Sequence, residues 1–243
     1  MGGSLVKIGH RGAAGYGPEN TLASFQEAID LGVDMVELDV HVCKSGELVV
    51  IHDETLERTT NGQGQVGDKT FAELRALDAG KGQQIPTLEE VIDLVHRRVA
   101  VNIELKSAKT GLPVAQLISQ YLEDGWDSGH FLVSSSNYEE LRRFRMFDQF
   151  SRTGLIVGKL SGALFSMSLF DPFELAVNLR CYSIHPRFNF VSRKFVKRAH
   201  QVGLMVFPWT VNSSARARRL VQMGVDGIFS DFPDQLLNIT KRA

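Results

Sequence analysis

The sequence predicts the α/β class and a TIM-type (β/α)8 barrel, in which eight parallel strands close into a ring surrounded by helices. The length of 243 residues is ordinary for one such barrel. Short apolar runs alternate with amphipathic stretches along the chain, as strands alternate with crossover helices. The runner-up is an open doubly wound sheet, which normally carries a G-x-G-x-x-G loop after its first strand. Gly9-His10-Arg11-Gly12 stands there instead, so the closed barrel is favoured.

The N-terminal part of the chain is predicted to contain three strands and one helix. The strands are residues 6–9, 35–40 and 48–51. Residues 21–31 form the helix, because their apolar side chains recur at helical spacing. Gly32 is a favourable residue for the end of that helix.

Residues 54–86 interrupt the alternation. They are rich in glycine and threonine, which is typical of turns and loops. We expect a single domain over residues 1–243, in which this segment is a small insertion that caps one mouth of the barrel. Thr87 and Glu90 then have the spacing of a capping box and predict the start of a new helix.

Alternation resumes after the insertion and accounts for the rest of the barrel. The predicted strands are residues 99–105, 131–134, 152–157, 181–184, 205–209 and 227–229. The amphipathic stretches between them are residues 114–123, 138–147, 172–179, 193–201 and 215–223. About eight strand-helix units in this order predict a closed ring rather than an open sheet.

Composition restricts the partners and the location. The formal net charge is −1, whereas a dedicated nucleic-acid-binding protein usually has a strong basic excess. No segment has the ~20 apolar residues that cross a bilayer, so we expect no stable membrane anchor. The first residues lack the features of a signal peptide. These observations predict a cytoplasmic location, with a leader removed from a longer precursor as the alternative.

The two cysteines, Cys43 and Cys181, lie far apart in the sequence. Two cysteines are not a disulfide framework, and their spacing is not that of a zinc site. We expect both to be reduced and partly buried. A homo-oligomer is left open by the sequence.

Polar residues interrupt or follow several of the early strands, and barrel enzymes place their active sites at the carboxyl ends of strands. These residues are His10-Arg11, Glu37 with Asp39, His52-Asp53, and Glu104 with Lys106. The members of the pairs Glu37–Asp39 and Glu104–Lys106 are two residues apart, so each pair shares one side of its strand. We expect that side to be the barrel interior.

Three carboxylates without cysteine ligands suit a hard divalent cation, Mg²⁺ or Ca²⁺, with Mn²⁺ as a further option. The alternative is that Glu37, Asp39 and Glu104 only form a structural salt network with Arg11 and Lys106. We disfavour this alternative because two histidines converge on the same barrel mouth as these charged residues.

Several segments carry a family resemblance, in this order along the chain: His10-Arg11-Gly12, Pro18-Glu19-Asn20-Thr21, Glu37-Leu38-Asp39-Val40, His52-Asp53, residues 56–60, residues 85–90, Glu104-Leu105-Lys106, residues 209–212 and residues 224–233. With these motifs the chain resembles the glycerophosphodiester phosphodiesterase family nearly from end to end. No single dipeptide among them is specific, but the ordered set is.

The resemblance implies a barrel with an insertion after the H-D strand. It implies metal-dependent hydrolysis of glycerophosphodiesters, such as glycerophosphocholine and glycerophosphoethanolamine, to glycerol 3-phosphate and an alcohol. It also implies residue roles: His10 and His52 as the catalytic acid and base, Arg11, Lys106 and Trp209 in substrate binding, and Glu37, Asp39 and Glu104 as metal ligands. Which histidine is the acid stays open, as does the nucleophile, which is either water or a glycerol hydroxyl.

Two other functions are weighed against this one. A lysophospholipase-D-like enzyme would act on lysolipids, and the apolar residues 165–173 would then form a lip at the mouth rather than pack in the helix layer. A non-catalytic barrel is disfavoured because both histidines and all three carboxylates are retained. One departure concerns Ser134-Ser135-Ser136-Asn137, where family members often have Ser-Phe, which puts an aromatic wall of the alcohol pocket in doubt.

Other polar residues have less certain places. Glu19 and Asn20 are either partners of Arg11 or the entry to the first helix. His41 is expected to face the helix layer or solvent. His185 either lines the pocket or has a structural role.

Overall fold

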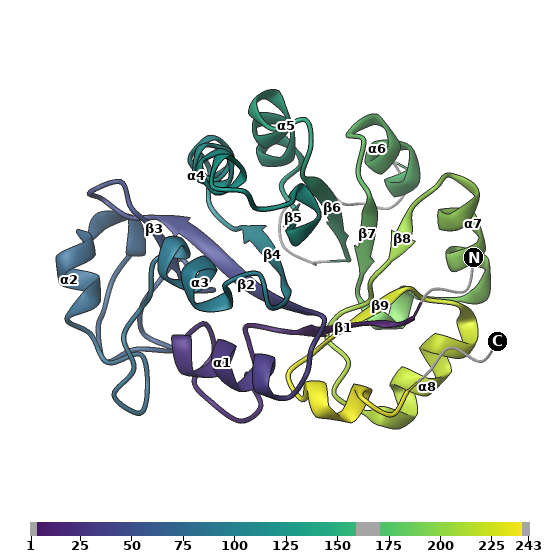
Figure 1. The fold of residues 1–243 in the computed structure, drawn as a ribbon, viewed down its shortest axis with the longest axis horizontal. Coiled ribbons are helices and arrows are strands. Elements are labelled where there is room, and N and C mark those ends of the chain that lie inside the picture. Colours follow the sequence, from purple (N-terminus) through teal and green to yellow (C-terminus); the bar gives the residue numbers. More distant parts are fainter. Residues whose placement is uncertain (1–3, 159–170, 240–243) are drawn as a thin grey trace.

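The computed structural model describes residues 4–158 and 171–239, which form a barrel of parallel strands surrounded by helices (Figure 1). The strands are β1 (Val6–Gly9), β2 (Met35–Val42), β3 (Leu48–Val50), β4 (Ala100–Leu105), β5 (Phe131–Ser135), β6 (Arg152–Val157), β7 (Ser183–Pro186), β8 (Met205–Val206) and β9 (Gly227–Ser230). Their order in the sheet is β8-β7-β6-β5-β4-β2-β1-β9, and every pairing along this order is parallel.

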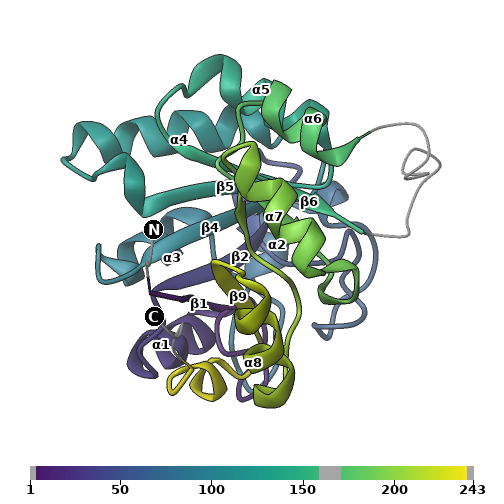
Figure 2. The same ribbon diagram turned by 90° about the vertical axis from the view of Figure 1, so that its right-hand side faces the viewer.

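The helices that cover the barrel are α1 (Leu22–Asp30), α3 (Leu88–Val95), α4 (Gly111–Glu123), α5 (Tyr138–Phe147), α6 (Pro172–Asn178), α7 (Arg193–Gln201) and α8 (Ser214–Met223). In Figure 2, α4 and α5 lie on one side of the strands, while α1 and α8 lie on the opposite side. Helices on all sides are the arrangement expected when a parallel sheet closes on itself.

Backbone hydrogen bonds join the two ends of the sheet. The amide of Asp226 donates to the Val206 carbonyl at 2.9 Å, and the amide of Phe229 donates to the Pro208 carbonyl at 3.1 Å. These bonds bring β9 beside β8 and close the ring. The predicted TIM-type barrel is therefore confirmed, although β8 is shorter than the predicted strand 205–209 because Pro208 has no N–H for a regular ladder.

Local sequence explains where the first helices begin and end. The hydroxyl of Thr21 accepts a hydrogen bond from the Ser24 amide and caps α1. Gly32 follows that helix with a φ of +79°, a conformation that glycine adopts without strain. Thr87 and Glu90 form the predicted capping box at the start of α3.

β3 differs from the expectation that each early strand belongs to the barrel. It runs antiparallel to β2, with Val42 paired to Leu48 and Val40 paired to Val50, and lies off the path of the parallel sheet. β2 has eight residues, so it extends beyond the ring and provides an edge for this ribbon. The chain therefore turns back, and His52 returns to the level of Asp39, whose carbonyl accepts from the Ile51 amide at 3.0 Å.

The segment between β3 and α3 contains the short helices η1 (Val66–Asp68) and α2 (Phe71–Arg75), which extend to one side of the ring in Figure 1. It has a small apolar cluster of its own, built from Cys43, Val49, Ile51, Leu56, Val66, Leu74, Ala79 and Ile85. This cluster fixes the segment against β3.

Apolar side chains pack on both faces of the strands. The outer faces of β2 and β4 bury residues such as Val36, Leu38 and Ile103 against the helices. The inner faces bury a separate group, which we call the interior cluster: Ile8, Met35, Leu132, Phe207 and Phe229. The interior cluster fills the barrel, so it forms a floor beneath the polar residues that occupy the strand ends.

Two simpler expectations can be compared with the structure. Cys43 and Cys181 are both free thiols, as predicted. None of the helices in residues 4–158 and 171–239 combines the length and the apolar composition needed to cross a membrane.

Candidate functional site

A cavity of about 100 Å³ opens at the carboxyl ends of the barrel strands. It is lined by His10, Arg11, Glu37, His52, Asn102, Glu104, Ser134, Ile156, His185, Trp209, Thr210 and Phe229. Six of the eight predicted site residues line this cavity. The other two, Asp39 and Lys106, lie beside it, because the Lys106 ammonium is 3.0 Å from Glu104 and 3.5 Å from Asp39.

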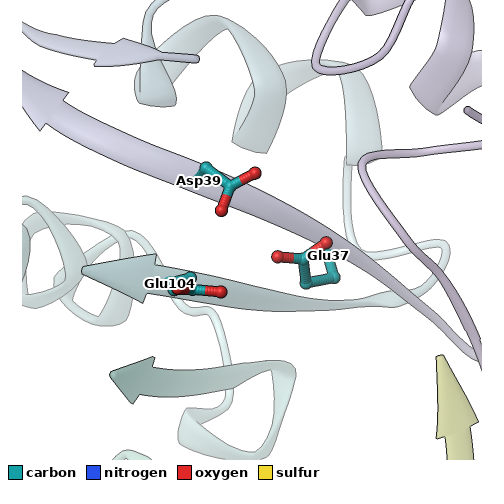
Figure 3. Close-up of side chains that lie close together, drawn as sticks. All are labelled: Glu37, Asp39 and Glu104. Carbon is teal, nitrogen blue, oxygen red and sulfur yellow. The ribbon is translucent and has the colours of Figure 1, made fainter. Parts of the chain in front are cut away.

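Three carboxylates on neighbouring strands form the acidic centre of the site (Figure 3). Glu37 and Asp39 lie on β2, and Glu104 lies on β4, directly beside Asp39 in the register of the sheet. One oxygen from each of the three side chains lies within 4.8 Å of the others, and the three residues are at most 9% exposed. The predicted clustering is therefore present, and this buried acidic triad can hold a metal ion.

The electrostatics of the triad fit a cation. Burial, together with the nearby charges of Asp39 and Glu104, raises the pKa of Glu37 to about 7. Burial would also raise the pKa of Asp39, but Lys106 and Arg11 reverse this and lower the pKa. One Asp39 oxygen, Oδ1, is buried and accepts no hydrogen bond. The Lys106 ammonium lies 3.5 Å from that oxygen, and repelling buried carboxylates of this kind are a donor set that a hard divalent ion would satisfy.

Arg11 is held between these carboxylates and the first helix. Its backbone amide donates to Glu37 Oε2 at 2.8 Å, which requires the left-handed φ of +53° at this residue. Its side chain donates to Glu19 Oε1 at 2.7 Å, and its Nε lies 3.3 Å from Asp39 Oδ2. Asn20 also contacts Asp39, donating to Oδ2 at 2.9 Å. Glu19 and Asn20 are thus partners of the acidic centre, while Thr21 caps α1.

His10 follows β1 and is oriented by a residue to which the sequence assigned no role. Its Nδ1 lies 2.6 Å from Asp231 Oδ1, at the end of β9. Asn212 holds this carboxylate in turn, donating to Asp231 Oδ2 at 2.5 Å. The opposite ring nitrogen of His10, Nε2, lies 4.0 Å from Glu37. The signal in the sequence was the place of Asp231 at the carboxyl end of the last barrel strand, which is where functional residues of barrels lie.

His52 is oriented in a similar way by its neighbour in the sequence. Its Nδ1 lies 2.5 Å from Asp53 Oδ1. The second oxygen of Asp53 accepts from Arg58 Nε at 2.5 Å. The two histidines therefore have the same support, a carboxylate on Nδ1 with a further donor behind it.

The two histidines differ in the direction of their pKa shifts. Burial would lower the pKa of His10, but Glu37 and the hydrogen bond with Asp231 raise it overall. Burial lowers the pKa of His52, and the positive charges of Lys106 and Arg11 act in the same direction, against Asp39. These opposite shifts arise because His10 lies near the carboxylates of Glu37 and Asp231, whereas His52 is desolvated near the positive charges of Lys106 and Arg11.

His41 and His185 are two further buried histidines near the site. The expectation for His41 was wrong. Residues 37, 39 and 41 are separated by two, so His41 shares the inward side of β2; it is 3% exposed, and its Nε2 lies 3.2 Å from the His52 carbonyl. His185 lines the cavity, and its Nε2 lies 2.8 Å from Ser183 Oγ. Burial lowers the pKa of His185 to about 3, so it is a neutral group.

Part of the cavity lining is apolar. Trp209 follows β8, and its indole Nε1 donates to the His185 carbonyl at 2.8 Å, which fixes the ring. Ile156 and Phe229 line the same cavity. Ser134 does so too, and its Oγ accepts from Asn102 at 2.9 Å. The wall at Ser134 is thus polar, where the resemblance led us to look for an aromatic side chain.

Most of the apolar segment 165–173 lies outside the described residues. Its last residue, Phe173, is buried in α6 and packs against Phe195 of α7 with ring centroids 4.9 Å apart. Of the two alternatives for this segment, a lip at the mouth or packing in the helix layer, Phe173 shows packing in the helix layer.

Comparisons with known proteins agree with this geometry. Residues 10–235 match the glycerophosphoryl diester phosphodiesterase family. A glycerophosphodiester phosphodiesterase from Caldanaerobacter subterraneus is 38% identical over 97% of both chains. The structure of an Oleispira antarctica phosphodiesterase in complex with the product sn-glycerol-3-phosphate is 31% identical, with a TM-score of 0.83 over 94% of both chains. A human lysophospholipase D is 28% identical and covers 94% of this chain and 84% of its own.

Proposed function

The chain belongs to the glycerophosphoryl diester phosphodiesterase family, and from this premise we propose that it hydrolyses small glycerophosphodiesters with the help of a divalent cation. The substrates we propose are glycerophosphocholine and glycerophosphoethanolamine, and the products are glycerol 3-phosphate and the free alcohol. The observation that carries the proposal is the cavity in which a buried acidic triad faces two carboxylate-supported histidines.

A phosphodiester anion repels nucleophiles, so its charge must be offset for reaction. We assign the triad of Glu37, Asp39 and Glu104 to hold a divalent ion, Mg²⁺, Ca²⁺ or Mn²⁺, which supplies Lewis-acid stabilisation of the phosphoryl oxygens. Arg11 adds a planar guanidinium for a forked contact with phosphate, and Lys106 adds a point charge. The Arg11 and Lys106 side chains both lie beside the triad. Their positive charges are therefore close to the place where the transition state gains negative charge.

The two histidines supply the proton transfers. One must accept a proton from the nucleophile while the other donates a proton to the leaving alkoxide. We propose that each histidine takes one of these two roles, because imidazole titrates close enough to neutral pH to serve in either. In both rings a carboxylate occupies Nδ1, which leaves Nε2 for the substrate.

The small volume of the cavity supports a small polar group as its occupant. Its volume of about 100 Å³ is below the ~300–1,000 Å³ of pockets that bury a drug-sized ligand. We infer that Trp209 packs against the glycerol carbon atoms while the phosphate faces the charged residues. The rest of the substrate would then extend from the mouth.

The human relative named lysophospholipase D favours a second candidate, a lysolipid substrate whose acyl chain lies outside the cavity. The two candidates share the triad and the histidines. They differ only in the part of the substrate that extends from the mouth of the barrel, so a comparison of substrates separates them.

A release assay tests the proposal. Chelator-treated protein is given glycerophosphocholine or glycerophosphoethanolamine, with and without Mg²⁺, Ca²⁺ or Mn²⁺, and glycerol 3-phosphate is measured. We expect release only when a metal is added, and a fall of ~100-fold or more in turnover for His10→Ala and for His52→Ala. Exposed His96→Gln serves as the control. Metal-independent release would contradict the metal role, and faster turnover of lysophosphatidylcholine would favour the second candidate.

A further inference from the structure

Arg58 lies in the segment between β3 and α3 and is outside the set of residues that line the cavity. Its side chain is 46% exposed. An exposed arginine that forms one ion pair would contribute little. Arg58 instead takes part in a network that reaches the site from two sides.

The guanidinium of Arg58 uses all three of its nitrogen atoms. Nε donates to Asp53 Oδ2 at 2.5 Å, while Nη1 and Nη2 donate to Glu19 Oε2 and Oε1 at 2.9 and 2.8 Å. Asp53 supports the ring of His52 with its other oxygen, and Glu19 Oε1 also accepts from Arg11. Arg58 therefore lies at the centre of a continuous path from His52 to Arg11.

Building on the proposed function, we propose that Arg58 is a positioning residue. By bridging Asp53 and Glu19 it fixes the His52 ring relative to the Arg11 guanidinium, and it does so without touching the substrate. The segment that follows β3 would thereby set the geometry of the reaction from outside the barrel.

Two features of the network support this role. The hydrogen bond from Arg58 is the main reason that the pKa of Asp53 falls to about 2, which reflects how closely the guanidinium is held to this carboxylate. Only an arginine has a fork for Glu19 together with a third donor for Asp53, whereas a lysine offers one point of charge. Without Arg58, Asp53 would keep His52 as its one side-chain partner in the described part of the chain, and its orientation would no longer be fixed.

Arg75 provides a matched control within the same segment. Its Nη1 and Nη2 donate to Glu90 at 2.8 and 2.6 Å, and Nη1 also donates to the Ile85 carbonyl. Like Arg58, it ties the segment to the rest of the chain through a forked ion pair. The Glu90 side chain bonds to Arg75 and Thr87 and, among the described residues, forms no hydrogen bond or ion pair with His10, His52 or Arg11. Loss of Arg75 therefore tests for a purely structural effect.

Kinetics on the metal-loaded enzyme with glycerophosphocholine form the first measurement. We expect Arg58→Gln to lower kcat by about 10- to 100-fold, because small displacements of reacting groups have effects of that size. Arg58→Lys should lower kcat by a smaller factor, and the kcat of Arg75→Gln should stay within about 2-fold of the wild-type value. Adding Arg58→Gln to Asp53→Asn should cost little more than Asp53→Asn alone, because the two residues act through one path.

The ¹⁵N resonances of the His52 ring, recorded without metal, form the second measurement. Their chemical shifts should change in Arg58→Gln and remain the same in Arg75→Gln. If the wild type releases no product from any glycerophosphodiester, the proposed function fails, while the ring resonances still test the positioning role. Unchanged kcat together with unchanged resonances in Arg58→Gln would overturn the proposal. The proposal would also be overturned if kcat fell equally in Arg58→Gln and Arg75→Gln, in proportion to the fall in their Tm.

Discussion

At the scale of single residues, the site depends on a carboxylate behind each histidine, Asp231 for His10 and Asp53 for His52. His10, Glu37, Glu104 and their neighbours could be found because they are polar residues at the ends of apolar strands. The support of His10 by Asp231 could not, because the two residues are 221 positions apart and only ring closure brings them together. His41 shows a different limit: the period of two placed it on the inward side of β2, and the expectation did not follow that rule.

His185 leads to a prediction about acid stability. It is buried, and its pKa in the folded protein is about 3, against about 6.5 for an ordinary histidine. Between these values the unfolded chain takes up a proton that the folded protein does not, so acidification favours unfolding. Above pH 6.5 this effect is absent. As the pH falls through the window, His185 should cost up to about 1.4 kcal/mol of stability per pH unit.

Urea unfolding of chelator-treated protein from pH 7.5 to pH 4.5 measures this effect. The difference in unfolding free energy between wild type and His185→Gln should change across the range, with the wild type losing more. The exposed His96→Gln should run parallel to the wild type. Parallel curves for wild type and His185→Gln would show that His185 is not the group responsible.

At the scale of elements, the prediction was accurate for amphipathic helices and less accurate for strand direction. The helix over residues 138–147 was predicted with the bounds that α5 has. Residues 48–51 were recognised as a strand, but an apolar run of that length reads the same whether it pairs parallel or antiparallel. Pairing depends on the neighbouring strand, so β3 could be placed only once the length of β2 was known.

Gly154 lies on β6, at a position where the neighbouring strand leaves no room for a side chain. A Cβ at this position would lie 2.5 Å from His185 Nε2 and 2.9 Å from Ser183 Oγ, on the adjacent strand β7. We expect Gly154→Ala to destabilise the protein by about 1–3 kcal/mol, because the buried His185 and Ser183 side chains would have to leave their packed positions. Denaturant midpoints would measure this. Gly67→Ala, whose Cβ would meet only the Val42 carbonyl at 4.0 Å, should be nearly neutral; equal midpoints would contradict the expectation.

At the scale of the whole molecule, the parallel order of the sheet followed from the alternation of strands and helices. The continuity of residues 4–158 and 171–239 with one barrel supports our proposal of a single domain with an inserted segment. The segment has its own small cluster, but that cluster includes Val49 and Ile51 beside the barrel. We therefore expect one cooperative transition in calorimetry rather than two.

Metal binding should be visible in that transition. Three buried carboxylates within 4.8 Å of one another repel in the absence of a cation, and an ion that binds only the folded protein stabilises it. At a metal concentration of 100 Kd, Tm should rise by roughly 5–10 °C. Glu104→Gln should reduce this rise, and the exposed Glu123→Gln should not. An unchanged Tm with Mg²⁺, Ca²⁺ and Mn²⁺ would argue against the site.

The antiparallel pairing of β3 has a consequence for how the site responds to heat. His10 follows β1, which has a neighbouring strand on each side within the ring, whereas His52 follows β3, which lies off the ring and pairs with the end of β2. A short ribbon can detach at a lower free energy than a closed ring can open. Local opening at β3 would therefore lower turnover on warming before the single cooperative transition unfolds the whole domain.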